Sequence, residues 1–201
     1  MVAATSYAFR SLSLDEWAGL PEDDDRELVD GTLVDSEMPN SIHEYILTWL
    51  NKILIPWADS RGARLFQAGL KFGVTPERGR YADMSIFFAG RKRSPGKAAV
   101  HRLPPNIIVE IVSPSAQNER RDRVEKVAEY ALFGVDWYWI IDPEWRTFEI
   151  LERGTDGKYR HMLGVGEGVI DPVPGCPELT LDITALWRAV DTMIAESDGE
   201  E

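Results

Sequence analysis

The sequence predicts an α/β protein in which helices cover both faces of a mixed β-sheet. Short apolar segments with strand composition make up most of the chain, and two amphipathic helical segments lie among them. One strand segment, at 106–112, is almost wholly β-branched, which is typical of a strand buried on both faces in the middle of a sheet. Helices on the two sides of one sheet bury such a strand most simply.

The size and composition of the chain favour one domain. With 201 residues and 44% hydrophobic content, we expect one globular domain over 1–201, with a core from about 10 to 190 and a short acidic C-terminal tail. The apolar stretches are shorter than the roughly 18 to 20 residues of a membrane span, and a signal peptide is not evident, so we expect a cytoplasmic protein. Cys176 is the one cysteine, and we expect it to be structural.

Capping and turn signals predict the first elements. Ser13 is an expected helix N-cap with Glu16 three residues later, which predicts a short helix. The segment "RELVDGTLVDSE" alternates around an Asp-Gly pair at 30–31, which predicts a hairpin. From Ser41, apolar residues recur at 3.6-residue spacing, which predicts an amphipathic helix that ends near Pro56.

The rest of the chain predicts further strands around a second helix. Strands are expected at 64–74, 80–88 and 106–112, with a basic loop before the last of them. A helix follows, with Ser115 as its N-cap and Gly134 as its stop. After it we expect the strand "VDWYWIID", a hairpin formed by "TFEILER" and "KYRHML", and "LTLDITALWRAV" as a strand and a short helix.

Charge is distributed unevenly along the chain. The net charge is -12, but residues 1–60, 61–126 and 127–201 carry -9 (3 basic, 12 acidic), +8 (14 and 6) and -11 (5 and 16). Either the acidic ends keep the protein soluble around a mixed surface, or the basic middle forms a positive surface suited to phosphate backbones.

Two carboxylates lie in apolar strand segments. Glu110 interrupts the β-branched segment, and burying an unpaired carboxylate costs several kcal/mol, so it requires a proton, a cation or a metal. Asp83 lies in the neighbouring segment "YADMSIFF". If the two strands pair, both acids reach one sheet edge and can bind Mg²⁺. Alternatively, Asp83 is a strand-end aspartate bonded to backbone groups.

The middle helix adds a lysine. Asp122, Lys126 and Tyr130 follow one another at four-residue intervals and therefore share a helix face. Lys126 on such a face can orient a water molecule or stabilise negative charge. The alternative is a surface lysine paired with Asp122.

These residues resemble a known family. The segment "IVEIVSPS", then Asp122, Lys126 and Tyr130, then "GVDWYWIIDP" are similar to the signature of the Uma-two family of restriction-endonuclease-like proteins, within the PD-(D/E)xK nuclease superfamily. The resemblance extends from "RELVDG" to "LTLDITALW" at 179–187. It implies a restriction-endonuclease-like, three-layer α/β/α fold with a mixed central sheet, metal-dependent hydrolysis of phosphodiester bonds, and a homodimer.

The resemblance also implies roles for single residues. Asp83 and Glu110 match the two acidic metal ligands, and the main-chain carbonyl of Ile111 is a further expected ligand. The motif lysine would stand two residues after Glu110, where this chain has Val112, and Lys126 on the next helix takes its place.

Three more positions are compared with the family. Ala82 stands where the superfamily prefers proline. Glu27 and His43 match recurring positions in the N-terminal part, with Glu27 expected to help hold a metal or water and His43 to contact the scissile phosphate or carry a proton.

The expected reaction is hydrolysis of DNA, with Mg²⁺, or Mn²⁺ in its place, on Asp83 and Glu110, and Lys126 at the attacking water. The residues expected to contact the DNA backbone lie in and beside the basic loop: Arg91, Lys92, Arg93, Lys97 and Arg102. Two other functions stay open. One is a non-catalytic nucleic-acid-binding or interaction protein that keeps the fold, and the other is a metal-free hydrolase with the two acids as an acid/base pair.

Overall fold

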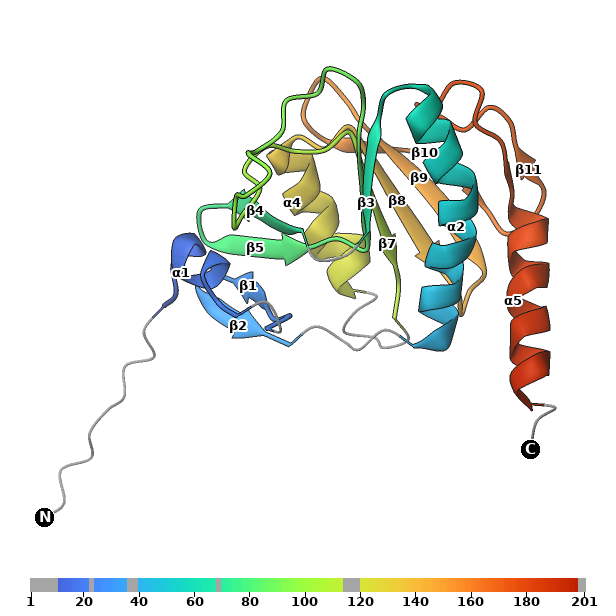
Figure 1. Ribbon diagram of the computed structural model, residues 1–201, viewed down its shortest axis with the longest axis horizontal. Coiled ribbons are helices and arrows are strands. Elements are labelled where there is room, and N and C mark those ends of the chain that lie inside the picture. Colours follow the sequence, from blue (N-terminus) through green and yellow to red (C-terminus); the bar gives the residue numbers. More distant parts are fainter. Residues whose placement is uncertain (1–10, 22–23, 36–39, 68–69, 114–119, 199–201) are drawn as a thin grey trace, which may run out of the picture.

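The computed structural model describes residues 11–21, 24–35, 40–67, 70–113 and 120–198 (Figure 1). Its centre is a six-stranded sheet in the order β10-β9-β8-β7-β6-β3. The strands of this sheet are β3 (Arg64–Gln67), β6 (Met84–Phe87), β7 (Ile107–Ile111), β8 (Trp137–Asp142), β9 (Thr147–Arg153) and β10 (Tyr159–Val165). The pair β7·β8 is parallel and the other pairs are antiparallel, so the sheet is mixed, as predicted.

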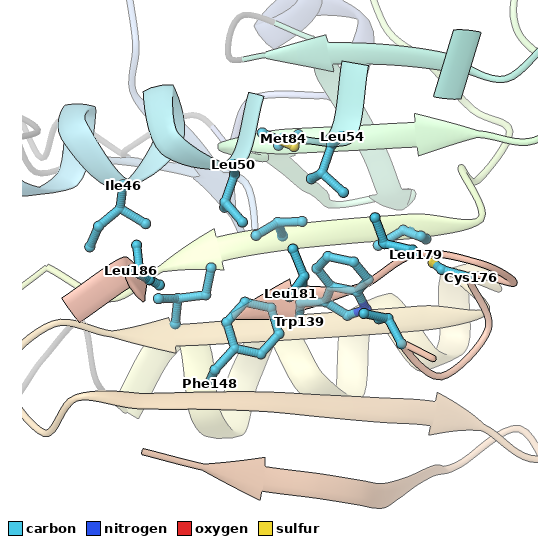
Figure 2. Packing of buried hydrophobic residues seen from close by; sticks show 14 of the residues in the cluster. Ile46, Leu50, Leu54, Met84, Trp139, Phe148, Cys176, Leu179, Leu181 and Leu186 are labelled. Atoms are coloured by element: carbon cyan, nitrogen blue, oxygen red, sulfur yellow. The ribbon is translucent and has the colours of Figure 1, made fainter. Parts of the chain in front are cut away.

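Helices lie on both faces of the central sheet (Figure 1). The helices α2 (Ser41–Ser60) and α5 (Ile183–Asp198) lie on one face, and α4 (Lys126–Phe133) lies on the other. Figure 2 shows Ile46 and Leu50 of α2 above Trp139 of β8, and Leu186 of α5 in the same cluster. The predicted three-layer α/β/α arrangement is therefore confirmed.

The strand that contains Glu110 is buried along its whole length. All five residues of β7 are buried, and alternate side chains enter the two opposite cores. Ile107, Val109 and Ile111 face α2 and α5, while Ile108 and Glu110 face α4. A carboxylate thus projects into the layer between the sheet and α4.

A second, four-stranded antiparallel sheet lies beside the central one, in the order β2-β1-β5-β4. Its strands are β1 (Glu27–Val29), β2 (Thr32–Val34), β4 (Lys71–Thr75) and β5 (Arg78–Tyr81). The short helix α1 (Leu14–Ala18) packs on it through Leu14 and Trp17. A small pair, β11 (Val169–Ile170) and β12 (Leu181–Asp182), precedes α5.

This second sheet corrects two predicted strands. The expected strands at 64–74 and 80–88 are each divided between the two sheets. The second division falls at Ala82 and Asp83, so Asp83 lies in a bend immediately before β6 and not inside a strand. Continuous apolar composition predicted the extended backbone here but carried no signal for the bend.

The first predicted amphipathic helix is longer than expected. Helix α2 continues through Pro56 to Ser60. Pro56 is exposed, so water can satisfy the carbonyl oxygen that its missing N–H leaves free. Leu54 and Trp57 are buried on the other side and hold the last turns against the sheet.

Capping and turn residues correctly predicted three features at the ends of elements. Ser13 and Glu16 form the predicted capping box. The Asp-Gly pair at 30–31 has positive φ at both residues and joins β1 to β2 as predicted. Gly134 ends α4 in the left-handed conformation. The expected N-cap Ser115 lies outside the described residues.

The C-terminal helix also differs from the expected short one. Helix α5 has 16 residues and reaches into the acidic segment predicted as a tail. Cys176 is buried in the core, where burial raises the pKa of its thiol to about 12, in agreement with a structural role. Among the described residues, no helix is both long and apolar enough to cross a membrane.

Candidate active site

The pairing of β6 with β7 brings Asp83 to Glu110. Met84 lies opposite Val109 in the antiparallel register, so the preceding Asp83 stands beside Glu110 at the end of β7. The N–H of Ile111 donates a hydrogen bond to Asp83 Oδ2 at 2.7 Å. Asp83 is therefore a strand-end aspartate bonded to the backbone and also a neighbour of the buried glutamate.

Glu110 is held from the α4 side. Its Oε2 lies 3.0 Å from Lys126 Nζ, and its Oε1 accepts a hydrogen bond of 2.6 Å from the Tyr130 hydroxyl. Burial raises the pKa of Glu110 well above its usual value; Lys126 opposes this rise, while Asp83 and Asp122 add to it. The ionised carboxylate is thus short of compensating positive charge.

Lys126 is a buried ammonium shared between carboxylates. It lies 2.9 Å from Asp122 Oδ1, one turn earlier, and it is 7% exposed. Burial opposes its charge, but Asp122, Glu110 and Glu27 raise the pKa of Lys126 well above its usual value. Burial also raises the pKa of Asp122, against the effect of Lys126. The raised pKa of Lys126 is consistent with the raised pKa values of Glu110 and Asp122. One ammonium shared by two buried carboxylates keeps its proton, while the charge of each carboxylate is only partly balanced.

The helix turn before Lys126 is unusual. Residues Arg121–Glu125 form a π-helical turn, η1, that leads directly into α4. π-Helical turns inside helices occur frequently at functional sites. Asp122 lies in this turn and Lys126 and Tyr130 follow in α4, and all three are buried, as expected for the predicted shared face. The opposite face carries Val124, which is exposed.

His43 closes the site from α2. Its Nε2 lies 3.1 Å from Asp83 Oδ2, and its amide is fixed by a hydrogen bond to the N-cap Asn40. Burial opposes protonation of the ring, yet Asp83 and Glu44 raise the pKa of His43 above its usual value. Asp83, with 24% of its side chain exposed, is more open to solvent than His43.

Glu27 is buried and lies on β1 of the four-stranded sheet. Its Oε2 lies 2.6 Å from Arg80 Nη1, and its Oε1 accepts a hydrogen bond from the Tyr81 amide at 3.3 Å. The distance from Glu27 Oε1 to Lys126 Nζ is 4.0 Å. Glu27 therefore contacts the lysine of the site and is occupied on its other oxygen by an arginine.

Arg80 and Glu129 did not emerge from the sequence as site residues. Arg80 is 0% exposed and forms hydrogen bonds of 2.7 and 2.8 Å to Glu129 in addition to its bond to Glu27. Arg78 also binds Glu129. The available signal was the spacing of Arg78 and Arg80, which puts two cations on one face of a strand and calls for acidic partners.

The basic loop lies at the other end of the central strands. Because β6 and β7 are antiparallel, the connection at 88–106 joins the edge where β7 begins, whereas Glu110 stands where β7 ends (Figure 1).

Three of the five predicted DNA contacts in and beside this loop already have protein partners. Arg91 donates to backbone carbonyls, Arg93 lies over the rings of Phe66 and Phe87, and Arg102 pairs with Asp15. Lys92 and Lys97 are exposed.

The donor set fits a small divalent cation. Asp83 and Glu110 supply carboxylate oxygens, and Mg²⁺ is commonly held by one or two carboxylates together with water and substrate phosphate. Among the described residues, no group of three or more histidine, cysteine or acidic side chains is placed to bind a metal by itself. The raised pKa of Glu110 points the same way, because a cation beside it would stabilise the ionised form. Ile111 contacts the site through its amide, and the role of its carbonyl oxygen stays a prediction.

Comparison with known proteins finds similarity to a family model and to solved structures. A family model, Uma2, described as "Putative restriction endonuclease", matches residues 12–184. A crystal structure described as "a putative nuclease belonging to DUF820 from Anabaena variabilis ATCC 29413" is similar with a TM-score of 0.68 and 22% identity, over 89% of this chain and 99% of that one. No curated protein sequence matches this chain.

Proposed function

Because the chain belongs to the Uma2 family of restriction-endonuclease-like proteins, we propose that it is a metal-dependent endonuclease that hydrolyses DNA phosphodiester bonds. Membership in this family and the nuclease-like fold support a nuclease. The substrate, the metal and the site residues are our own assignment. It is carried by one observation: Asp83, Glu110 and Lys126 meet at the end of β7, with Lys126 Nζ 3.0 Å from Glu110.

In this proposal Asp83 and Glu110 hold Mg²⁺ or Mn²⁺, with the carbonyl of Ile111 as a further ligand. When bound, the cation supplies positive charge at the scissile phosphate. Glu110 is presented rigidly, because β7 is buried on both faces and the Tyr130 hydroxyl fixes one carboxylate oxygen. Asp83 is fixed by the Ile111 amide.

Lys126 acts on the attacking water and on developing negative charge. Its ammonium has three N–H donors, of which two are directed to Glu110 and Asp122. The raised pKa keeps it protonated at neutral pH, so it serves as a hydrogen-bond donor and not as a base. In this proposal His43, which is paired with Asp83, contacts the phosphate or carries a proton, and Glu27 supports Lys126.

The DNA backbone is proposed to contact the basic loop as well. Among the predicted positions, Lys92 and Lys97 are exposed, Arg93 and Arg102 are exposed but also contact other side chains, and Arg91 is partly buried and bonded to backbone carbonyls. Contacts of this kind are independent of sequence and sensitive to salt, so K92A/K97A should weaken DNA binding and reduce its salt dependence. The proposal includes a homodimer, which would present one site to each strand of a duplex.

Cleavage of supercoiled plasmid and linear duplex, with Mg²⁺, Mn²⁺ or EDTA, tests the proposal. Wild-type protein should cleave with either metal and not with EDTA. D83A, E110A and K126M should each lower the rate by at least about 100-fold. K158M is the matched lysine control, because Lys158 lies in the turn between β9 and β10, away from the site, and should leave the rate unchanged.

The outcomes separate the open functions. Folded wild-type protein that binds DNA without cutting it favours a non-catalytic binding protein. Cleavage that continues unchanged in K126M would refute the assigned role of the lysine. Hydrolysis of another bond class without any metal would favour the acid/base pair.

A further inference from the structure

Arg80 joins three parts of the protein around the site. It stands on β5, three residues before Asp83, and its side chain is fully buried. Its guanidinium binds Glu27 of β1 at 2.6 Å and Glu129 of α4 at 2.7 and 2.8 Å. Two carboxylates therefore accept hydrogen bonds from this arginine, and that of Glu125 lies 3.8 Å from its Nη2. A planar guanidinium group with five donors suits several acidic partners.

Glu27 has a second cation within reach. Its other oxygen, Oε1, is 4.0 Å from Lys126 Nζ, whereas Lys126 lies 3.0 Å from Glu110 and 2.9 Å from Asp122. Three carboxylates thus surround one ammonium, and the nearest two determine where it points. A change of about 1 Å, the difference between 4.0 and 3.0 Å, is enough to exchange Glu110 for Glu27 as its neighbour.

We infer that Arg80 is a positioning residue. Its guanidinium pairs with the Glu27 carboxylate and neutralises it, so that Lys126 stays directed to Glu110. Without Arg80, Lys126 is the nearest cation to the buried Glu27 carboxylate and turns toward it. The ammonium then moves away from the end of β7. This inference rests on the proposed function for its kinetic consequence but not for its structural one.

The structural test of this inference does not depend on DNA cleavage. In a crystal structure of R80M at neutral pH without metal, the Lys126-to-Glu27 distance should become shorter than the Lys126-to-Glu110 distance, which reverses the present order. R80K is examined in parallel as the variant more certain to fold, because its ammonium can satisfy one of the two carboxylates. The inference is wrong if Lys126 keeps its present contacts in R80M, or in R80K when the ammonium at position 80 pairs with Glu129 and not with Glu27.

The kinetic arm uses a second substitution as a suppressor. R80M should lower kcat by about 100-fold with little change in the KM for DNA, because the misplaced group acts in the chemical step. R80M/E27Q should regain at least about tenfold of that loss, since the uncharged amide at position 27 no longer attracts Lys126. If Arg80 only stabilised the fold, R80M/E27Q should be less active than R80M, because the second substitution would weaken the ion-pair network further.

R78M is the matched control. Arg78 binds Glu129 and Asp30, so this variant weakens the same link to α4 without releasing Glu27. Its rate should stay within about threefold of wild type at equal folded fraction. An equal loss of activity in R78M and R80M, or no recovery in R80M/E27Q, would overturn the inference. If wild-type protein cuts no DNA, the proposed function fails, and the crystal structures still decide the position of Lys126.

Discussion

At the scale of single residues, the site contains more buried carboxylates than cations that could balance their charge. Glu110 and Asp122 share Lys126, and Asp83 adds a further negative charge at the end of β7. Burial raises the pKa of both Glu110 and Asp122. Such an arrangement costs stability and suits a site that binds a cation.

E110Q tests this cost. The folded-state pKa of Glu110 lies above its unfolded value, so this carboxyl group opposes folding at pH values above its unfolded-state pKa; the cost decreases as pH falls from the folded-state pKa toward the unfolded-state pKa and is gone below it. The uncharged glutamine should therefore raise the free energy of unfolding at about pH 7.5 by about 1 kcal/mol while it abolishes cleavage. Urea denaturation followed by circular dichroism measures the change. A less stable E110Q would show that the ionised carboxylate is well compensated by Lys126.

The sequence predicted some residues of the site and missed others for an identifiable reason. Asp83 and Glu110 stand out because charged residues are rare in apolar strands, and Lys126 follows from helical spacing. Arg80 lies 53 residues from Glu27 and 49 from Glu129 in sequence. Pairing over such separations depends on how the two sheets are arranged, which local patterns do not specify.

At the scale of elements, the four-stranded sheet carries Glu27 and Arg80, and α1 packs on this sheet. The Trp17 ring is fully buried against β5, and its Nε1 donates to the Arg26 carbonyl at 2.7 Å. A Cβ atom at Gly79 would lie 2.3 to 2.7 Å from three carbons of this ring. Gly79 is therefore required by close approach of a large side chain that is itself fixed.

G79A should reduce the free energy of unfolding by about 1 to 3 kcal/mol, because the ring has to move to admit the methyl group. G96A is the control, since a Cβ at Gly96 meets no heavy atom within 4 Å. Equilibrium urea unfolding of both variants provides the comparison. Equal stability of G79A and G96A would mean that the packing of α1 on β5 is loose.

The link between α4 and β5 should depend on pH. Burial opposes ionisation of Glu129, but hydrogen bonds from Arg80 and Arg78 lower the pKa of Glu129 below its usual value. A carboxyl group with a lowered pKa stabilises the fold above its unfolded pKa of about 4.3, and this contribution is lost as pH falls below it. E129Q should thus be less stable than wild type at about pH 7 by about 2 kcal/mol, with the difference narrowing below about pH 4.3.

Denaturation midpoints of wild type and E129Q between neutral and acid pH provide the measurement. A difference that stays constant over this range would assign the contribution of Glu129 to packing and not to its charge. Acid unfolding that precedes the narrowing can be avoided by measuring the rates of unfolding from neutral stocks.

The predicted elements show where local patterns fail. Helix α2 and strands β7 and β8 follow from periodicity and composition, which act within a single segment. The predicted end of α2 was wrong. A proline need not end a helix where it is exposed, as Pro56 is, and exposure depends on tertiary packing. The bend at Asp83 was missed because it arises from a change of sheet and not from a turn residue.

At the scale of the whole molecule, the two ends of the central strands differ in character. The end of β7 brings together Asp83, Glu110 and the start of α2, whereas the basic loop joins the beginning of β7 (Figure 1). The sequence predicted the layers of the fold, because apolar segments bury their faces in few ways. It did not predict which loops share an end of the sheet, since this follows from strand direction in the assembled sheet.

In the proposed function, Asp83 and Glu110 bind a divalent cation beside Lys126. Isothermal titration of Mn²⁺ into wild type, D83N and K126M tests it most directly. Wild type should bind one Mn²⁺ per chain, D83N at least about tenfold more weakly, and K126M at least as tightly as wild type, because a neighbouring positive charge has been removed. Equal Mn²⁺ affinity in D83N and wild type would contradict the claim.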